Sequence, residues 1–450
     1  MIPLTLGEIA TITGGRLVNA APDTLVDGPV EFDNRRTLTG GLFVAFDGEK
    51  VDGHSFAGAA VAAGAAGVLG ARDTGQPGVV VDDQIEALAR LARHSVDRLP
   101  GLTVVGVTAS SGKTTTKDFI GQLLSRLGET IAPPGSLNNE LGFPYTALKA
   151  TASTRFLVLE MGARNVGHIR HLAEIAPPKI GAVLNVGAAH IGKFGSIEQT
   201  ALAKGELIEA LPADGVAVLN ADDPLVSAMA TRTQARVVFF SESDVAGIRV
   251  DERDRASFTL DGHPVHLKVS GRHQVSNTLA AAAVAVAAGM PVADAAAALS
   301  EVTIRSERRM DVFDRPDGVT VIDDTYNANT SSTVAALRSL ATLGAGRRTV
   351  AVLGYMAELG DQEDAGHREV GRLAAELGVD RLIAVSEEAR PVLDGAAEVP
   401  GWTGTAEFAA DQPAAIALLR PEPGDVFLVK ASRYRTWDVV DALRPEGVRP

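Results

Sequence analysis

The sequence predicts an α/β protein of several domains built on parallel sheets, and three observations support this prediction. The chain has 450 residues, which is more than one hydrophobic core usually supports, so roughly two to four domains are expected. Short, continuous apolar runs, as buried parallel strands show, recur along the chain. Helical patterns lie between several of these runs, and this alternation is typical of a doubly wound sheet.

Residues 1–98 are expected to form a small first domain. An apolar run at residues 41–46 precedes an Ala- and Gly-rich helical pattern at residues 56–67, as in a small α/β unit. Turn residues occupy positions 97–101, and the continuous apolar run that follows at 102–107 is typical of a buried strand. We therefore expect the second domain to begin at residue 99.

The second domain, residues 99–311, is expected to hold a doubly wound sheet. Four later apolar runs in it have the character of buried strands, at residues 156–159, 180–186, 216–219 and 237–240. The pattern becomes polar between residues 305 and 317. Beyond this segment, runs at 319–322, 349–353, 381–385 and 426–429 alternate with helical patterns, which predicts a third α/β domain over residues 312–450.

The composition narrows the classes of function. A formal net charge of −14 and a pI near 5.2 argue against a general affinity for nucleic acid or anionic membranes. The absence of cysteine excludes disulfides and thiolate metal sites, so oxygen or imidazole ligands and hence Mg²⁺ are favoured. The longest apolar stretch, residues 279–288, is too short to span a bilayer, and the N-terminus lacks a signal pattern. We expect a cytoplasmic protein without membrane insertion.

The strongest chemical signal is the loop Thr-Ala-Ser-Ser-Gly-Lys-Thr-Thr at residues 108–115. It follows the strand run at 102–107 and precedes a helical pattern at 117–127, which is the context that a phosphate-binding loop needs. Small residues let backbone N–H groups approach phosphate oxygens, and the start of the helix adds a partial positive charge. Lys113 can neutralise the terminal phosphates, and Thr114 is placed to ligate Mg²⁺.

The loop does not match the strict phosphate-loop pattern, because the glycine that the pattern has upstream of Gly112 is missing here. A chance Gly-Lys-Thr in a turn is the alternative interpretation. The coincidence of strand, small-residue loop and helix nevertheless favours an ATP site. The residues of the loop assigned to ATP are Thr108, Ser110, Ser111, Gly112, Lys113, Thr114 and Thr115.

Four further side chains are candidates for the reaction, each with a simpler alternative. Glu160 ends a buried strand and His190 follows another, at the sheet edge that faces the phosphate loop, so both can reach a metal there. The simpler alternatives are a surface carboxylate for Glu160 and a solvated histidine for His190. Lys204 lies on a helical pattern and, from the residues alone, is best interpreted as solvated. Arg309, next to Arg308, can reach a transferred phosphoryl group only if the domains close; an interdomain salt bridge is equally good.

The order and spacing of these motifs resemble the Mur ligase family over essentially the whole chain. The segments that carry the resemblance are Asp33-Asn34-Arg35-Arg36 and residues 108–115, 137–144, 159–163, 188–196, 203–206, 271–273, 323–329 and 356–360. The family fold implies a small N-terminal α/β domain that binds a UDP-sugar, a central P-loop ATPase-like domain with a parallel sheet, and a C-terminal Rossmann-like domain for the amino substrate. The predicted segments 1–98, 99–311 and 312–450 match this division.

The resemblance also implies roles for individual residues. Thr114 and Glu160 resemble ligands of the ATP magnesium, and His190 and a carbamylated Lys204 resemble ligands of a second magnesium, so the resemblance overrides the solvated interpretation of Lys204. Lys113, Lys204, Arg309 and His190 are the implied catalytic residues. Implied ligand contacts are Asn139, Asn277, Arg309, Asp324 and Asn327 for ATP, Asn34 and Arg35 for the UDP moiety, and Asn329, Lys430, Ser432 and Arg433 for the amino substrate and closure over it.

The implied activity is ATP-dependent amide formation through an acyl phosphate, and the best-fitting branch joins UDP-N-acetylmuramoyl-tripeptide to D-alanyl-D-alanine in peptidoglycan precursor synthesis. ATP, Mg²⁺ and these small molecules would be its ligands, with no nucleic acid, and a monomer is expected. Three positions depart from the family pattern: Ala109, Gln274 and Tyr355. At Ala109 the backbone would need a positive φ, at a cost of roughly 1 kcal/mol relative to glycine.

Three alternatives remain open at this point. A bulky Tyr355 on the face toward the amino substrate would suit a paralogue that joins a different carboxylate and amine in specialised metabolism. A folylpolyglutamate synthase-like ligase would share the central domain, but the first domain with Asp33-Asn34-Arg35 argues against it. A catalytically silent nucleotide-binding protein is disfavoured by the joint presence of Lys113, Glu160, His190, Lys204 and Arg309.

Overall fold

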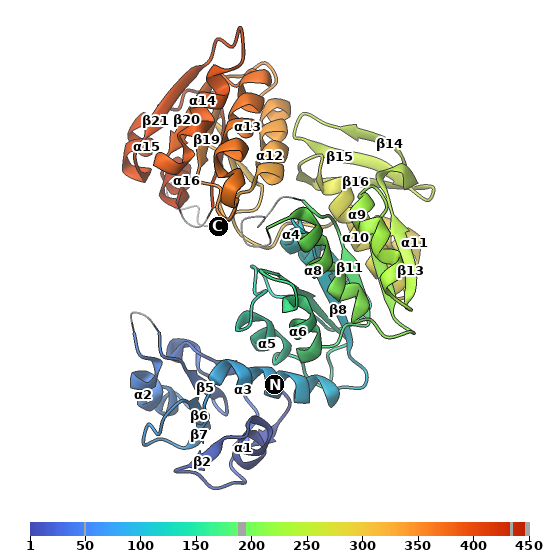
Figure 1. Cartoon of the computed structure of the whole chain (residues 1–450), viewed down its shortest axis with the longest axis vertical. Coiled ribbons are helices and arrows are strands. Elements are labelled where there is room, and N and C mark those ends of the chain that lie inside the picture. The colour runs from blue at the N-terminus through green and yellow to red at the C-terminus, as the bar shows by residue number, and fades with distance from the viewer. Residues whose placement is uncertain (49–50, 188–194, 433–434, 446–450) are drawn as a thin grey trace.

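The structure is a computed structural model that describes residues 1–48, 51–187, 195–432 and 435–445. Figure 1 shows three bodies stacked along the long axis, with the N-terminal residues at the bottom and the C-terminal residues at the top. Each body contains a sheet with helices packed against it, so the predicted α/β class is confirmed. Within the described ranges, no helix combines the length and the apolar character that crossing a bilayer requires.

The N-terminal body is built on a five-stranded sheet in the order β2-β7-β6-β5-β4. Its strands are β2 (Arg16–Val18), β4 (Val30–Glu31), β5 (Leu42–Ala45), β6 (Gly67–Gly70) and β7 (Gly78–Val80), and β1 (Leu4–Thr5) pairs with β3 (Leu25–Val26) beside them. The helices are α1 (Leu6–Thr13), α2 (Ala57–Ala62) and α3 (Gln84–Asp97), with short 3₁₀ turns η1 (Asn34–Arg36) and η2 (Gly53–Phe56). The run at 41–46 is therefore a strand, as predicted, but the helix expected to continue to residue 67 ends at Ala62.

The central body holds a six-stranded parallel sheet in the order β13-β12-β11-β8-β10-β9. The strands are β8 (Thr103–Thr108), β9 (Thr130–Ile131), β10 (Phe156–Glu160), β11 (Ile180–Val183), β12 (Val216–Asn220) and β13 (Arg236–Phe240). All five runs predicted as strands in this segment are confirmed, but β13, at the edge of the sheet, is not fully buried as expected, and its Phe239 is 47% exposed. Helices α4 (Lys113–Leu124), α5 (Gly142–Ala147), α6 (His168–Ile175), α8 (Ile197–Glu209), α9 (Pro224–Ser227), α10 (Gln274–Ala287) and α11 (Val292–Leu299) surround the sheet.

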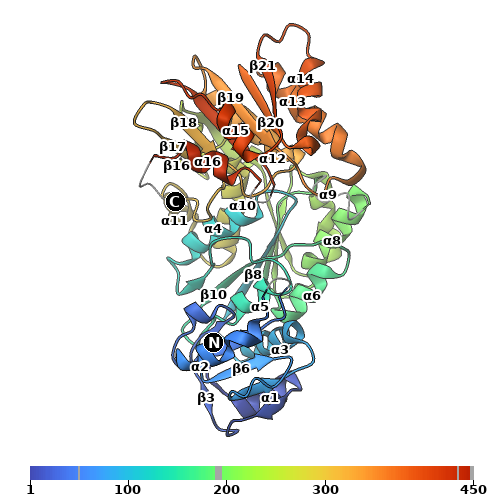
Figure 2. The ribbon, with the colours of Figure 1, turned by 90° about the vertical axis from the view of Figure 1, so that its left-hand side faces the viewer.

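Strand β8 lies between β10 and β11, and this order assembles the site. Glu160 pairs with Val107, and Val183 pairs with Thr108. Because parallel strands point the same way, the loops that follow β8, β10 and β11 emerge side by side at one edge of the sheet. Helix α4, which begins in the first of these loops, lies at the end of the central body that faces the C-terminal body (Figure 2).

A three-stranded antiparallel sheet in the order β14-β15-β16 was not predicted. Its strands are β14 (Val245–Val250), β15 (Arg255–Leu260) and β16 (His263–Ser270). Alternate residues such as Phe258, Val265 and Leu267 are buried in the core that also contains α10 and α4, while their neighbours face solvent. One-sided burial gives an alternating pattern rather than a continuous apolar run, so this sheet left no buried-strand signal.

The C-terminal body holds a six-stranded sheet in the order β17-β18-β22-β19-β20-β21, parallel except for β17. Its strands are β17 (Asp311–Asp314), β18 (Thr320–Asp323), β19 (Thr349–Gly354), β20 (Arg381–Val385), β21 (Thr405–Ala409) and β22 (Val426–Lys430). Its helices are α12 (Thr330–Leu343), α13 (Glu363–Glu376), α14 (Pro391–Ala397), α15 (Gln412–Leu418) and α16 (Trp437–Leu443). The four runs predicted as strands here are confirmed.

Candidate functional site

A cavity of about 840 Å³ lies between the central and C-terminal bodies. It brings together most of the site residues that the sequence indicated. Those that line it are Ser110, Ser111, Gly112, Lys113, Thr114, Thr115, Asn139, Glu160, Lys204, Asn277, Arg309, Asp324, Asn327, Asn329 and Lys430. Among the described residues, Thr108, Ser432, Asn34 and Arg35 do not line it, and His190 and Arg433 lie outside the described part of the chain.

The loop after β8 turns into α4 at Gly112, whose φ is +83°. A Cβ atom at this position would lie 2.5 Å from Oδ1 of Asn277 on α10, so the glycine allows both the left-handed turn and the close approach of α10. Sequence reasoning missed Asn185, which follows β11. Its Oδ1 accepts hydrogen bonds from the N–H groups of Ser110 (3.1 Å) and Ser111 (2.9 Å) and thereby fixes the loop.

Replacing Gly112 by alanine should weaken nucleotide binding by about tenfold or more, because the left-handed conformation costs an alanine roughly 1–2 kcal/mol and its methyl group would collide with Asn277. Titration calorimetry with ADP measures the effect. Gly289→Ala is the matched control: φ at Gly289 is +99°, but an added Cβ meets nothing within 4 Å. Equal ADP affinity in the Gly112 variant would show that the tight turn is not needed for phosphate binding.

The positive φ expected at Ala109 is not observed. Its methyl group is fully buried in the core beneath the loop, and the residue instead contributes its carbonyl oxygen to the site. This oxygen accepts hydrogen bonds from Nζ of Lys113 (2.6 Å) and Nζ of Lys204 (3.0 Å). The alanine therefore imposes no left-handed strain on the loop.

Glu160 is buried rather than a surface carboxylate, with 3% of its surface exposed. Its Oε2 accepts a hydrogen bond from the Thr114 hydroxyl (2.8 Å), and its Oε1 accepts from the Ser136 hydroxyl (2.8 Å) and Nδ2 of Asn138 (2.7 Å). Neither Ser136 nor Asn138 was assigned a role from the sequence, although both precede Asn139. The hydroxyl and carboxylate oxygens of Thr114 and Glu160 form a compact oxygen donor set, which suits Mg²⁺.

Lys204 is also buried, with 2% of its surface exposed, so the solvated interpretation is wrong. Burial, with a smaller contribution from the charge of Lys113, holds the pKa of the Lys204 amine well below its usual range. Burial likewise lowers the pKa of Lys113, although the Glu160 carboxylate opposes this shift. An ammonium group cannot ligate a metal, whereas a carbamate formed by a neutral amine and carbon dioxide supplies carboxylate oxygens.

Arg309 and Arg308 point to different partners. Nη2 of Arg309 donates to the Thr114 hydroxyl (3.3 Å), and its guanidinium lies 4.1 Å from the centre of the Tyr326 ring. Arg308 instead binds Asp441 (2.9 Å) and lies over Trp437. At the boundary between the two bodies, Arg309 thus contacts the start of α4 after the phosphate loop, and Arg308 binds within the C-terminal body.

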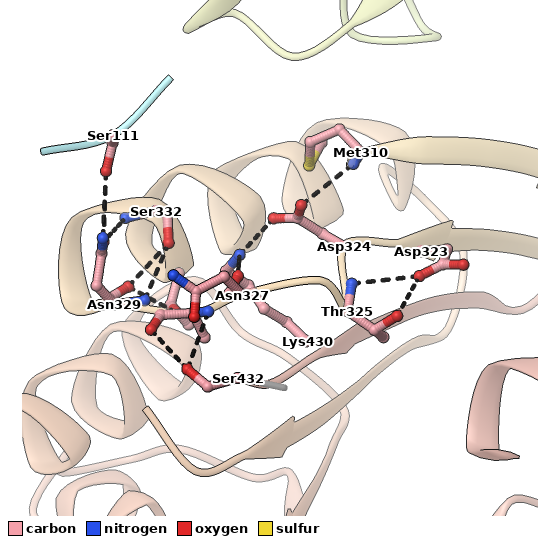
Figure 3. A network of polar contacts seen from close by, with 12 residues as sticks. Ser111, Met310, Asp323, Asp324, Thr325, Asn327, Asn329, Ser332, Lys430 and Ser432 are labelled. Atoms are coloured by element: carbon pink, nitrogen blue, oxygen red, sulfur yellow. Dashed lines mark hydrogen bonds and ion pairs between the residues drawn. The ribbon is translucent and has the colours of Figure 1, made fainter. Parts of the chain in front are cut away.

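The C-terminal body contributes a connected set of polar contacts, drawn in Figure 3. Asp324 accepts hydrogen bonds from Nζ of Lys430 and from the backbone N–H of Met310 (3.2 Å). Asn329 caps α12 and donates to the Ser111 hydroxyl of the phosphate loop (3.3 Å), so it bridges the two bodies. Since Asp324 already compensates the charge of Lys430, this lysine fixes the carboxylate before any ligand binds.

Ser432, predicted to contact substrate, has an internal role in this conformation. Its hydroxyl accepts hydrogen bonds from the N–H groups of Ala328 (3.2 Å) and Ala357 (3.0 Å), and only 1% of the residue is exposed. It therefore holds the segment after β18 against the segment after β19.

Gln274 and Tyr355, two of the residues that depart from the family pattern, lie in different parts of the structure. Gln274 accepts a hydrogen bond from Nδ2 of Asn277 (2.8 Å) and so orients that amide toward the phosphate loop. Burial lowers the pKa of the adjacent His273 to about 4, which keeps its ring neutral. Tyr355 donates to Glu363 (3.1 Å) and stacks on His367, and it is not among the residues that line the described cavity.

Asn34 and Arg35 lie in η1 of the N-terminal body, outside this cavity. The Arg35 guanidinium donates to Asp33 through Nε (2.9 Å) and Nη2 (2.8 Å). These hydrogen bonds hold the pKa of the Asp33 carboxyl at about 2, so the carboxylate remains charged at neutral pH. The Arg35 side chain is 83% exposed, so a ligand in solution can reach its guanidinium.

Two family models match the sequence. The model described as Mur ligase middle domain matches residues 107–285, and the model described as Mur ligase, glutamate ligase domain matches residues 308–433. The first match contains the phosphate loop, Glu160 and Lys204, and the second contains Arg309, Asp324 and Lys430.

Similar proteins align over nearly the whole chain. UDP-N-acetylmuramoyl-tripeptide–D-alanyl-D-alanine ligase of Mycobacterium tuberculosis (strain ATCC 25618 / H37Rv) is 48% identical over 96% of each chain. The enzyme of the same name from Escherichia coli (strain K12) is 34% identical over 99% of this chain and 100% of its own. The crystal structure of MurF from Acinetobacter baumannii superposes with a TM-score of 0.86 at 30% identity, covering 98% of both chains. MurF ligase from Thermotoga maritima in complex with ADP gives a TM-score of 0.77 at 30% identity, covering 92% of this chain and 96% of its own.

Proposed function

Because the chain belongs to the Mur ligase family, we propose that it joins UDP-N-acetylmuramoyl-tripeptide to D-alanyl-D-alanine, with conversion of ATP to ADP and phosphate. The product is the UDP-N-acetylmuramoyl-pentapeptide, a precursor of peptidoglycan, and we place the reaction in the cytoplasm. The observation that carries the proposal is the cavity in which the phosphate loop, Glu160, Lys204 and Arg309 meet. The ligase of Mycobacterium tuberculosis, at 48% identity, supports the substrate pair.

ATP is placed with its phosphates on the loop at residues 110–115 and its base toward α10. The loop presents backbone N–H groups at the start of α4, where the helix dipole favours an anion. Asn277 packs directly against Gly112, so a nucleotide on the loop would have this amide at its side. Asp324, Asn139 and Asn327 line the same cavity and complete the proposed nucleotide contacts. The ADP complex of the relative from Thermotoga maritima supports the nucleotide assignment.

The chemistry begins when the tripeptide carboxylate attacks the γ-phosphate. Lys113 and Arg309 flank the Thr114 side of the cavity, so their charges stabilise the charge that develops on the transferred phosphoryl group. An acyl phosphate and ADP result. The dipeptide amine then attacks the acyl carbon, and the tetrahedral intermediate collapses to the amide and phosphate, while contact between the two bodies keeps water from the acyl phosphate.

The proposed metal ligands divide into two sets. Thr114 and Glu160 would hold one magnesium ion, and His190 with a carbamylated Lys204 would hold a second. Magnesium at these positions would neutralise charge on the phosphate and carboxylate oxygens. The low pKa of the Lys204 amine supports the carbamate, because only a neutral amine attacks carbon dioxide.

The remaining ligand assignments follow the three expected domains, at residues 1–98, 99–311 and 312–450. The UDP moiety is placed at Asn34 and Arg35, where an exposed guanidinium can meet a pyrophosphate. We propose the dipeptide at the edge of the C-terminal sheet where Asn329 caps α12 and Lys430 ends β22. Ser432 would support this edge from beneath, and Arg433, assigned to the same ligand, lies outside the described residues. Tyr355 lies outside the described cavity, which weakens the argument for a paralogue with a different amine.

Phosphate release with ATP, Mg²⁺, UDP-N-acetylmuramoyl-tripeptide and D-alanyl-D-alanine tests the proposed function, with each organic substrate omitted in turn. We expect phosphate release to require both substrates and mass spectrometry to identify the pentapeptide product. ATP binding without product would favour a paralogue with another substrate pair or a catalytically silent nucleotide-binding protein.

A further inference from the structure

Helix α4 holds the segment that connects the central and C-terminal bodies. Its first turn carries Lys113 and Thr114, while its second turn carries Asp118. Oδ2 of Asp118 accepts hydrogen bonds from the backbone N–H groups of Arg305 (3.2 Å) and Ser306 (2.8 Å). The helix that begins at the phosphate loop therefore also fixes the linker between the bodies, which we define as residues 300–310, between α11 and β17.

A second contact of the same kind lies one turn further along α4. The Gln122 amide pairs with the backbone of Thr303, donating through Nε2 (2.7 Å) and accepting through Oε1 (3.1 Å). Two successive turns of the helix thus hold the linker over residues 303–306.

A third segment, residues 133–135, meets the linker beside Asp118. Nζ of Lys117 donates to Oδ1 of Asp118 (2.7 Å) and to the carbonyl oxygen of Pro133. The Ser306 hydroxyl accepts a hydrogen bond from the N–H of Gly135 (2.9 Å). We call the set formed by Lys117, Asp118, Ser306 and the backbone of residues 133–135 the α4 junction. The three side chains belong to residues that are nearly inaccessible, with 2%, 2% and 4% of their surfaces exposed.

Each segment that meets at the α4 junction continues into a group at the reaction site. Helix α4 begins at Lys113 and Thr114. The segment after Gly135 supplies Ser136 and Asn138, which bind Glu160. The linker after Ser306 supplies Arg309, which reaches Thr114. Lys117, Asp118 and Ser306 are not among the described residues that line the cavity, so they act on the site only through these segments.

The linker beyond the junction has an unfavourable backbone. Arg308 and Met310, on either side of Arg309, have φ values of +59° and +51°. Non-glycine residues adopt this conformation at a cost, and they keep it only where surrounding contacts impose it. On the C-terminal side, those contacts are the hydrogen bonds from Met310 to Asp324 and from Tyr326 to the carbonyl oxygen of Arg308. On the central side, the hydrogen bonds to Asp118 anchor the linker just before Arg308.

From this arrangement we infer that Asp118 is a positioning residue: it fixes the linker to the phosphate-loop helix, so that Arg309 reaches Thr114 only while the two are joined. The inference rests on the proposed function for its kinetic test, because it concerns a group of that reaction. Its physical basis is the charge of Asp118, which is compensated by Lys117 and directed at two backbone donors of the linker. Nucleotide binding at the start of α4 is then coupled to the placement of Arg309, at the far end of the same linker.

The kinetic test compares Asp118→Ala with the matched control Asp425→Ala in the ligation assay. Asp425 is also 2% exposed and also pairs with a cationic side chain and a backbone N–H, but it lies before β22, away from the cavity. We expect Asp118→Ala to lower kcat about 10²-fold, as a displaced catalytic group does, with the KM for ATP within about threefold of wild type. Asp118→Asn keeps one oxygen acceptor for the linker but loses the charge that Lys117 compensates, so it should recover only part of the loss. An Asp118→Ala loss no larger than that of Asp425→Ala would overturn the inference.

A double-mutant cycle with Arg309→Ala separates positioning from general damage. If Asp118 acts through Arg309, Asp118→Ala should lower kcat less than about threefold once Arg309 is already alanine. A loss in that background equal to the loss in wild type would contradict the inference. Where Asp118→Ala does not fold, Asp118→Leu provides the same cycle, because it fills similar space but offers the linker no acceptor.

Hydrogen exchange gives a readout that does not depend on ligation. Binding of Mg²⁺ and a non-hydrolysable ATP analogue should slow amide exchange across residues 303–310 in the wild-type chain and in Asp425→Ala, but not in Asp118→Ala at saturating nucleotide. Unchanged exchange in the wild type, or an equal response in Asp118→Ala, would overturn the coupling. If the wild type forms no pentapeptide, the proposed function fails, while this exchange experiment still decides the inference.

Discussion

Replacing Lys204 by alanine is expected to lower the rate of ligation by about 10²–10³-fold, the range typical for loss of one electrostatic stabiliser. The side chain is buried beside Lys113 and the Ala109 carbonyl oxygen, so its truncation removes a group from the interior of the site. Short carboxylic acids such as formate and acetate should restore part of the activity, because the proposed carbamate presents a carboxylate and the alanine leaves space for one. Phosphate release with and without each acid measures both effects.

Two controls sharpen this prediction. Lys179→Ala removes a lysine of the same body that is 41% exposed and paired with Asp214, so its rate should match wild type with or without added acid. Carbon-13 NMR of the wild-type protein with labelled bicarbonate should show a carbamate signal that Lys204→Ala lacks. Full activity of the unrescued variant would refute the carbamate role.

The central parallel strands were predictable because they are enclosed on both faces and therefore have continuous apolar sequences. The run at 102–107 became β8, and the run at 156–159 became β10 with Glu160 at its end. The order of chain segments around the phosphate loop was also predictable, since strand, small-residue loop and helix are adjacent in sequence. These features are enough to place Lys113, Thr114 and Glu160 at one sheet edge.

Contacts between segments that are distant in sequence could not be predicted in this way. The helical pattern around Lys204 has no local sign that its polar face packs on Ala109, so periodicity indicated solvent where the structure has a buried amine. Asn185 gave only the weak signal of a polar residue after a strand. The Asp118 contacts with the linker join residues 187 and 188 positions apart, and no local pattern encodes them.

Replacing Arg309 by alanine is expected to lower kcat by about 10³-fold with a smaller change in the KM for ATP, as for arginines that stabilise a phosphoryl-transfer transition state. The Tyr326 ring holds its guanidinium, which is directed at Thr114, so the guanidinium can stabilise the negative charge that develops on the γ-phosphate. Arg309→Lys should recover little. An ammonium lacks the planar set of donors of a guanidinium and cannot stack on the Tyr326 ring while it reaches Thr114. Single-turnover measurement of ADP formation isolates this step.

Arg308→Ala is the informative neighbour for this experiment. It removes the ion pairs with Asp441 and, at 3.7 Å, with Asp323, and the contact with Trp437, which together are worth about 1–2 kcal/mol of stability. It removes no group directed at the phosphate loop. Its melting temperature should fall while its single-turnover rate stays within about tenfold of wild type. If Arg309→Ala instead raised the KM for ATP and left kcat unchanged, Arg309 would bind the ground state and the transition state equally, and its role would be nucleotide binding alone.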